Sequence, residues 1–396
     1  MEVYLDNNST TPIDPKVKDV YIQTIEKYGN VNVIYNKGIE TRALLNEAYD
    51  KMYAAINASD EDDIIVTSST TEGNNIVIKT FLHAFLKGSP KNHVISTVAE
   101  HSSIKSPLKY CKDMGMEVTY IGTDSKGLVK LDELEAAITD KTALISVLIA
   151  SNETGAIQDI KAISAIAKKH GVYFHSDGAQ AIGKMAVDVQ DLGVDYFTWS
   201  AHKFHGPKGV GGIFVKAGVP YTPLIHGAKN VMGGKRAGSL YNNGVAAMAT
   251  AMEIANINLS FFDHTTRALR DYLEEELLKI PDTKSYVPKE HRLKNLVAMS
   301  FRGIEGEAML WDMNMNTIYL STGSSCSSED LESSAVVEAL GEKTEIANAT
   351  VMFALSKFTT KEQIDYVLEK VKATVERLRG ISMTYAKQEA FSVHLH

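Results

Sequence analysis

The chain has 396 residues, of which 44% are hydrophobic and 23% charged, a composition typical of a globular protein of about two domains. The net charge of −8 argues against a general nucleic-acid-binding surface. With no membrane-length apolar run, no basic-then-apolar leader and only two cysteines, a cytoplasmic protein without a disulfide framework is expected.

Short apolar runs alternate with helical patterns through the first two thirds of the chain. One such helical pattern covers Asp159–His170, with Ile160, Ile163 and Ile166 on one face. This alternation predicts an α/β fold, in which a mostly parallel sheet carries helices on both faces. The predicted strands are Asp63–Thr67, His93–Thr97, Glu117–Ile121, Ala143–Ala150, Val172–Ser176, Tyr196–Trp199 and Gly211–Val215.

A long helical pattern begins after Gly244, continues to about Leu278, and is interpreted as the link to a second domain. The remainder predicts a smaller α+β domain with two strands and a closing helix, Asn295–Arg302, Val351–Leu355 and Lys361–Arg379. The end, Tyr385–His396, has no pattern and is expected to be loose. We expect residues 15–255 to form the large domain, and residues 1–14 and 256–396 to form the small one.

An acid and a lysine follow neighbouring strands of the predicted sheet. Asp177, with Gln180 close behind, follows Val172–Ser176, and Lys203 follows Tyr196–Trp199. Ligands of open α/β sheets lie beyond the carboxyl ends of the strands, so both side chains are expected at one site. Taken singly, Asp177 is compatible with a helix cap and Lys203 with a surface lysine. Together they indicate a site for pyridoxal 5′-phosphate (PLP), whose ring is tuned by such a pair.

The polar stretch Ser68–Asn75 follows the strand Asp63–Thr67 and opens a helical pattern. Hydroxyls and free backbone N–H groups at a helix N-terminus form an anion site, although a plain capping box is equally compatible with this pattern. A phosphate group bound here would complete a PLP site. Its predicted ligands are Thr70, Thr71, Ser200 and His202.

Two further residues are candidates for the chemistry. His101 follows the strand His93–Thr97, where it could stack on a ring and act as an acid or base near neutral pH. Cys326 lies among serines just after Gly323, so that a mobile loop could carry its thiolate to a substrate, unless it is only a small residue in a turn. Cys111 is interpreted as a helical core residue, and no metal site is expected.

These motifs resemble the NifS/IscS-type cysteine desulfurases, in the class V aminotransferase group of fold-type I PLP enzymes. The resemblance covers roughly residues 3–380, and the order and spacing of the motifs make it specific. The stretches that carry it are Tyr4–Thr11, Thr71-Glu72, Ala99–His101, Ser151–Gly155, Asp177–Gln180, Ser200–Lys203, Arg236–Ser239 and Ser324–Ser328.

The resemblance implies a large domain with a seven-stranded, mostly parallel sheet, and a role for each motif. Lys203 would hold PLP and move protons, while Asp177 would pair with the pyridine nitrogen. Gln180 would contact the ring oxygen, and His101 would stack on the ring. The implied phosphate ligands are Thr71, Ser200, His202 and, across the subunit interface of a homodimer, Ser239.

The resemblance also implies the reaction. Asn152 would lie near the substrate, and Cys326 would take the sulfur of L-cysteine as a persulfide, leaving L-alanine. The persulfide would then pass to an iron–sulfur scaffold or to another thiol acceptor.

The chain departs from the family pattern on the substrate side. Met352 stands where the family carries an arginine for the substrate carboxylate, and Lys357 replaces the following arginine. The stretches Gly29–Tyr35 and Gly227–Asn230 have changed as well. If the substrate is cysteine, Arg236 or Lys357 is expected to hold its carboxylate instead.

Three hypotheses follow from these departures. The first is a cysteine desulfurase, and the second is a PLP-dependent lyase or transaminase for an amine or a modified amino acid without a free α-carboxylate. The third is a PLP-containing dimer that acts mainly as a binding partner in cluster assembly.

Overall fold

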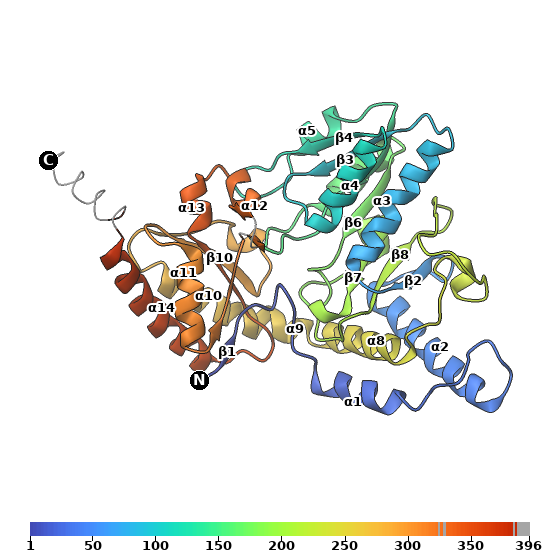
Figure 1. Ribbon diagram of the computed structural model, residues 1–396, viewed down its shortest axis with the longest axis horizontal. Coiled ribbons are helices and arrows are strands. Elements are labelled where there is room, and N and C mark those ends of the chain that lie inside the picture. The colour runs from blue at the N-terminus through green and yellow to red at the C-terminus, as the bar shows by residue number, and fades with distance from the viewer. Residues whose placement is uncertain (324, 328–329, 383–384, 386–396) are drawn as a thin grey trace.

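The computed structural model describes residues 1–323, 325–327, 330–382 and 385, and among residues 324–332 it describes no side chains. Its larger part is built around a seven-stranded sheet of order β2-β8-β7-β6-β5-β3-β4 (Figure 1). Strand β8 runs antiparallel to both neighbours and the other pairs are parallel, which confirms the predicted fold class. The strands are β2 (Asp63–Thr67), β3 (His93–Thr97), β4 (Glu117–Ile121), β5 (Thr142–Ser146), β6 (Tyr173–Asp177), β7 (Tyr196–Ser200) and β8 (Gly211–Val215).

Successive side chains of the buried strands enter two different cores, because they point to opposite faces of the sheet. In β2, Ile64 and Val66 pack into one core, and Ile65 packs into the other. Helices α2, α6 and α8 supply the first core, and α3 and α4 supply the second. The helices of this part are α1 (Pro15–Thr24), α2 (Asn36–Ile56), α3 (Thr70–Leu86), α4 (Ser102–Asp113), α5 (Leu131–Ala136), α6 (Ile160–Lys169), α7 (Val189–Leu192) and α8 (Asn242–Ile257).

Most predicted strand bounds hold to within one residue, and the largest difference is at β5. This strand ends at Ser146 and not at Ala150 as predicted, but the apolar run beyond it stays extended. The backbone N–H of Val147 donates to the backbone oxygen of His175, and that of Ile149 donates to the backbone oxygen of Asp177. Asp177 is also the last residue of β6 and not the first residue after it, which keeps its backbone inside the sheet.

A smaller antiparallel sheet of order β12-β15-β10-β9 lies beside the large one and has its own core. The N-terminal strand β1 pairs with β11 in this region, in agreement with the expectation for residues 1–14. The domain boundaries at residues 15 and 255 themselves stay a prediction. The elements here are β1 (Val3–Tyr4), β9 (Thr283–Ser285), β10 (Leu296–Phe301), α11 (Gly306–Met315), β11 (Ile318–Tyr319), β12 (Ser321–Thr322), α12 (Ala335–Ala339), α13 (Thr344–Asn348), β15 (Thr350–Ala354) and α14 (Lys361–Ile381).

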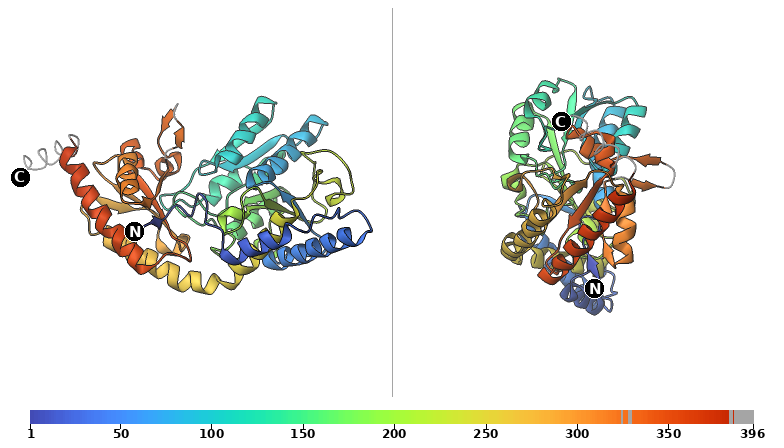
Figure 2. Two further views of the ribbon diagram at one scale, coloured as in Figure 1. Left: turned by 60° about the horizontal axis from the view of Figure 1, so that its bottom comes forward. Right: turned by 90° about the vertical axis from the view of Figure 1, so that its left-hand side faces the viewer.

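The long helical pattern after Gly244 is not one helix. Helix α8 is followed by α9 (Leu259–Phe261), a π-helical turn (Phe262–Thr266) and α10 (Arg267–Leu277), with a 51° bend after α8. The bend directs the chain from the large sheet to the small one, as Figure 2 shows. Among the described residues, no single helix has the length and apolarity to cross a membrane, and only this bent pair passes that test jointly.

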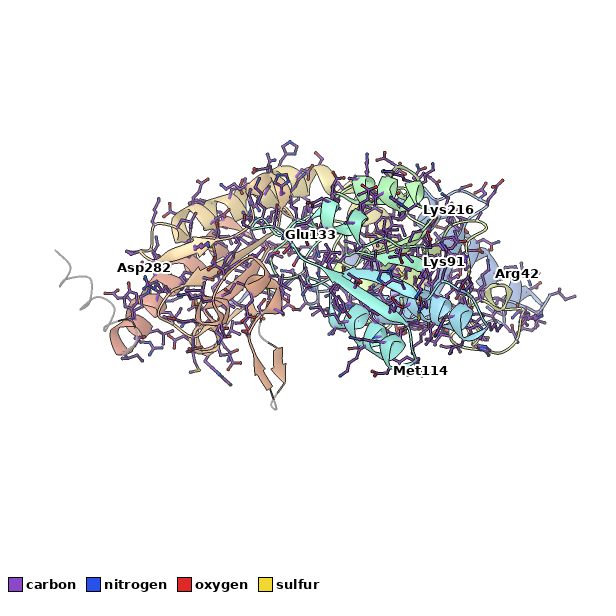
Figure 3. All side chains as sticks on the ribbon, turned by 90° about the horizontal axis from the view of Figure 1, so that it is seen from above. Arg42, Lys91, Met114, Glu133, Lys216 and Asp282 are labelled. Atoms are coloured by element: carbon purple, nitrogen blue, oxygen red, sulfur yellow. The ribbon has the colours of Figure 1, made fainter. Side chains whose placement is uncertain are left out.

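The predicted catalytic cysteine lies on a hairpin. Strands β13 (Ser325–Ser327) and β14 (Asp330–Glu332) pair antiparallel, and Cys326 is opposite Leu331. This hairpin stands out from the body of the molecule in Figures 2 and 3. The side chain of Cys326 lies outside the described residues, and so does most of the C-terminal stretch that was expected to be loose.

Candidate active site

A cavity of about 370 Å³ opens at the carboxyl ends of the parallel strands, a size typical of small-molecule sites. Most of its lining residues lie at or just after the ends of β2, β3, β5, β6 and β7, the edge of an open α/β sheet where ligands bind. Nine residues predicted to bind a cofactor or substrate line it: Thr70, Thr71, His101, Asn152, Asp177, Gln180, Ser200, His202 and Lys203.

Lys203 ends the short 3-10 turn that follows β7. Its Nζ donates to the backbone oxygens of Asn8 and Ser9, both at 2.7 Å. Burial lowers the pKa of Lys203 to about 8, against the opposing attraction of Asp177 and Asp6. A lysine with this pKa is partly unprotonated near neutral pH, which is the form that can react with a carbonyl group.

Asp177 is buried at the end of β6 and both of its carboxylate oxygens accept hydrogen bonds. The backbone N–H of Ala179 donates to Oδ1 at 2.9 Å, and Asn74 donates to Oδ2 at 2.7 Å. In the part of the chain that the structure describes, Asp177 has no salt bridge, so its charge faces the cavity without a cation. Gly178 keeps this end of β6 close to β7, because a Cβ atom there would stand 2.0 Å from the ring of Phe197.

The amide of Gln180 is held in one orientation. Its Oε1 accepts a hydrogen bond from the buried Lys184, and its Nε2 donates to the backbone oxygen of Asn8 at 2.8 Å. Burial, together with repulsion from Lys203, lowers the pKa of Lys184 to about 7. Because Nε2 carries a second hydrogen, Gln180 can still donate one hydrogen bond to a ligand in the cavity.

Another part of the cavity has the composition predicted for an anion site. Ser69 caps α3 by accepting from the backbone N–H of Glu72, and the first two residues of the helix, Thr70 and Thr71, line the cavity. Ser200 lies here as well, with its Oγ at 2.6 Å from the backbone nitrogen of Thr70. Burial lowers the pKa of His202 to about 4, so this imidazole is neutral and its Nδ1 contacts the Thr10 hydroxyl at 3.1 Å.

His101 lies at the side of the cavity and caps α4. Its Nδ1 is 2.9 Å from the hydroxyl of Ser103 and accepts from the backbone N–H of the same residue at 3.1 Å. Burial lowers the pKa of His101, although Asp177 opposes this shift. The ring is therefore neutral at pH 7.

Asn8 and Asn152 line the side of the cavity where the substrate is predicted to bind. Nδ2 of Asn8 donates to the backbone oxygen of Asn152 at 2.7 Å, while its buried Oδ1 has no hydrogen-bond partner among the described residues. One cavity thus contains a carboxylate without a salt bridge, the N-terminus of a helix and a lysine of lowered pKa. It also contains a hydrogen-bond acceptor without a partner among the described residues, Oδ1 of Asn8. This donor set fits a pyridine nitrogen, a phosphate and an aldehyde, the three groups of PLP.

Four predicted residues lie outside this cavity: Arg236, Lys357, Met352 and Ser239. Arg236 is ion-paired with Glu72, Nε to Oε1 at 3.0 Å, and Lys357 is ion-paired with Asp14. Each cation already neutralises a half-buried or buried acid and would have to change partner to hold a substrate carboxylate, so that role stays a prediction. Met352 is buried on β15, and Ser239 is exposed.

Four site residues escaped the sequence reasoning: Asn8, Asn74, Ser103 and Lys184. Their functions depend on contacts between distant segments, such as Asn8 with Gln180. One signal was available for Lys184, which interrupts the mostly apolar stretch from Ala181 to Val187.

Comparisons with known proteins agree with this geometry. The family model described as aminotransferase class-V matches residues 3–367. The chain is 39% identical to a cysteine desulfurase IscS of Dictyoglomus turgidum, over 96% of both chains, and 38% identical to one of Methanosarcina thermophila, over 98% of this chain and 95% of that one. A solved NifS-like protein matches with a TM-score of 0.89 and 36% identity, over 95% of this chain and all of that one.

Proposed function

The chain belongs to the class V aminotransferases, and on this premise we propose that it is a cysteine desulfurase, which converts L-cysteine to L-alanine and keeps the sulfur as a persulfide on Cys326. The observation that carries the proposal is the single cavity in which Lys203, Asp177 and the N-terminus of α3 meet. The likeness to the named desulfurases over nearly the whole chain supports it.

The proposed cofactor is PLP, which when bound supplies an electron sink for the carbon that carries the substrate amine. Asp177 would hold the protonated pyridine nitrogen, and Gln180 would donate to the ring oxygen. His101 would lie against the ring. The phosphate would lie at the N-terminus of α3, against the hydroxyls of Thr71 and Ser200, with neutral His202 beside them.

Lys203 would be the group that forms the covalent link and moves protons at the substrate. Its lowered pKa supports both roles, since an unprotonated amine is needed to accept a proton. The carbonyl oxygens of Asn8 and Ser9 hold Nζ in place, and Asn152 would lie beside the bound substrate.

Cys326 would act as the nucleophile toward sulfur. Its thiolate forms a bond to the sulfur of cysteine while the bond from that sulfur to carbon breaks. The electron pair of the broken bond stays with the carbon fragment, which takes up a proton and leaves as alanine. The persulfide then passes to an iron–sulfur scaffold or another thiol acceptor.

We further propose a cytoplasmic homodimer, in which Ser239 completes the phosphate site of the other subunit. Ser239 is exposed and outside the cavity of its own chain, which supports a role across an interface.

One observation favours a second candidate, a PLP-dependent lyase or transaminase acting on an amine without a free carboxylate. Arg236 and Lys357 are both ion-paired, and Met352 brings no charge. The test is incubation of the PLP-loaded protein with L-cysteine and, separately, with amines that lack a carboxylate. Alanine from cysteine supports the desulfurase, and turnover of the amines alone supports the second candidate.

A further inference from the structure

Asn74 connects the predicted pyridine anchor to the predicted ring-stacking histidine. Its side chain is fully buried on the first turns of α3, where Gly73 allows close approach to β7. Nδ2 of Asn74 is 2.7 Å from Oδ2 of Asp177 and 2.9 Å from Oγ of Ser103. Oδ1 of Asn74 is 2.7 Å from Oγ1 of Thr198.

The chemistry of these partners fixes the direction of every hydrogen bond. Both oxygens of Asp177 face N–H donors, as those of an ionised carboxylate do, and such a group only accepts. The atom of Asn74 that faces Asp177 must therefore be the amide nitrogen. Its oxygen then faces Thr198, whose hydroxyl must donate.

On the buried side of this network, the direction of each hydrogen bond is fixed as well. Because Thr198 uses its hydrogen toward Asn74, its oxygen accepts from Nε2 of His175 at 3.3 Å. Nδ1 of His175 then accepts from the hydroxyl of Ser146 at 2.9 Å. Burial lowers the pKa of His175 to about 3, so this ring is neutral, and one neutral tautomer satisfies both contacts.

The cavity side of the network determines the tautomer of His101. The second hydrogen of the Asn74 amide goes to the oxygen of Ser103, which leaves the Ser103 hydroxyl hydrogen for Nδ1 of His101. The backbone N–H of Ser103 also points at this Nδ1. A nitrogen that accepts from two donors cannot carry a proton, so the neutral ring carries its proton on Nε2.

We propose that Asn74 is a positioning residue that, through Ser103, fixes His101 as the neutral Nε2–H tautomer. His101 then offers a hydrogen bond from Nε2 to a ligand in the cavity and does not act as a base there. Proton acceptance falls to Lys203, which also lines the cavity. The proposal rests on the proposed function only in that Asp177 is ionised when the pyridine nitrogen is bound.

The test is nitrogen NMR of PLP-loaded protein labelled with ¹⁵N-histidine, in the absence of substrate. The signals of His101 are assigned by their loss in His101→Gln. The expected result at about pH 7 is a protonated Nε2 and an unprotonated Nδ1. A protonated Nδ1, or a charged ring at that pH, would overturn the proposal, whatever the enzyme does with cysteine.

Two variants separate the function of Asn74 from general stability. In Asn74→Ala the hydroxyl of Ser103 is released and can turn to accept from Nδ1, while the backbone N–H of Ser103 still points at that nitrogen, so we expect a measurable minor population of the Nδ1–H tautomer beside the Nε2–H one. The matched control Thr198→Val removes another hydrogen bond of Asn74, but Asp177 still orients the amide, so the wild-type tautomer is expected. An unchanged tautomer in a folded Asn74→Ala protein contradicts the function of Asn74. If that variant does not fold, the wild-type measurement still decides the tautomer.

Discussion

The side-chain nitrogen of Asn8 lies 3.6 Å from the sulfur of Met352, and both residues are buried beside the cavity wall. Asn8 also donates to the backbone oxygen of Asn152 and accepts from Lys203 through its own backbone oxygen. Met352 therefore contacts the residue that holds the lysine and the substrate side together. A change at position 352 can therefore reach both Lys203 and Asn152 through Asn8.

Met352→Arg is predicted to increase cysteine turnover, because a guanidinium forms a bidentate, charge-assisted pair with a carboxylate. We expect kcat/KM for L-cysteine to rise about tenfold or more, which corresponds to about 1.4 kcal/mol. Alanine formation is the measurement, and Met352→Leu, similar in volume and uncharged, is the control. No gain, or a loss, in a folded Met352→Arg protein means that the pocket is shaped around methionine.

Lys203→Ala is predicted to remove the visible absorbance that PLP gains when it is linked to a lysine, together with all turnover. The reason is that Lys203 is the lysine whose pKa is lowered to about 8 and whose Nζ lies at the cavity. The absorbance spectrum of the purified protein checks this. Lys216→Ala, an exposed lysine after β8, is the control and is expected to keep the band. A retained band in Lys203→Ala would contradict the assignment of Lys203 as the lysine that is linked to PLP.

Cys326→Ala is predicted to keep PLP and lose persulfide. The other cysteine, Cys111, is fully buried, and burial raises its pKa to about 11, so it stays an unreactive thiol. Cys111→Ala is therefore the matched control and should form persulfide at the wild-type level. Mass spectrometry of the intact protein after incubation with L-cysteine measures the added sulfur in both variants. Undiminished sulfur loading on Cys326→Ala removes Cys326 from its proposed role.

Glu100→Gln is predicted to remove a pH dependence of stability. Glu100 is buried beside Asp177, and burial raises its pKa from 4.5 to about 8. The folded protein thus binds more protons than the unfolded chain between these values, so the free energy of unfolding falls as the pH rises through this range. Denaturant unfolding at about pH 5 and pH 8 should show this fall in the wild type and a smaller one in Glu100→Gln. Equal falls contradict the account.

Sequence patterns predicted the large sheet well because its strands are short apolar runs buried on both faces. The runs Asp63–Thr67 and Gly211–Val215 match β2 and β8 at both ends. The break after α8 was missed, because helical segments continue on both sides of it and no proline or glycine in the sequence marks the bend.

In the site, residues at strand ends were predictable and the residues that orient them were not. Asp177 and Lys203 follow apolar runs that can be read along the chain. Lys184 and Asn74 act through contacts with Gln180 and Asp177 that only the folded chain creates. The ion pair of Arg236 with Glu72 is of the same kind, since it joins segments that are far apart in the sequence.

The most direct test of the proposed function quantifies alanine and the Cys326 persulfide in one reaction of PLP-loaded protein with L-cysteine. In a single turnover without an acceptor, we predict one alanine per persulfide, and no persulfide in Cys326→Ala. A protein with an intact lysine-linked PLP band that forms neither product contradicts the account and directs the search to amines without a carboxylate.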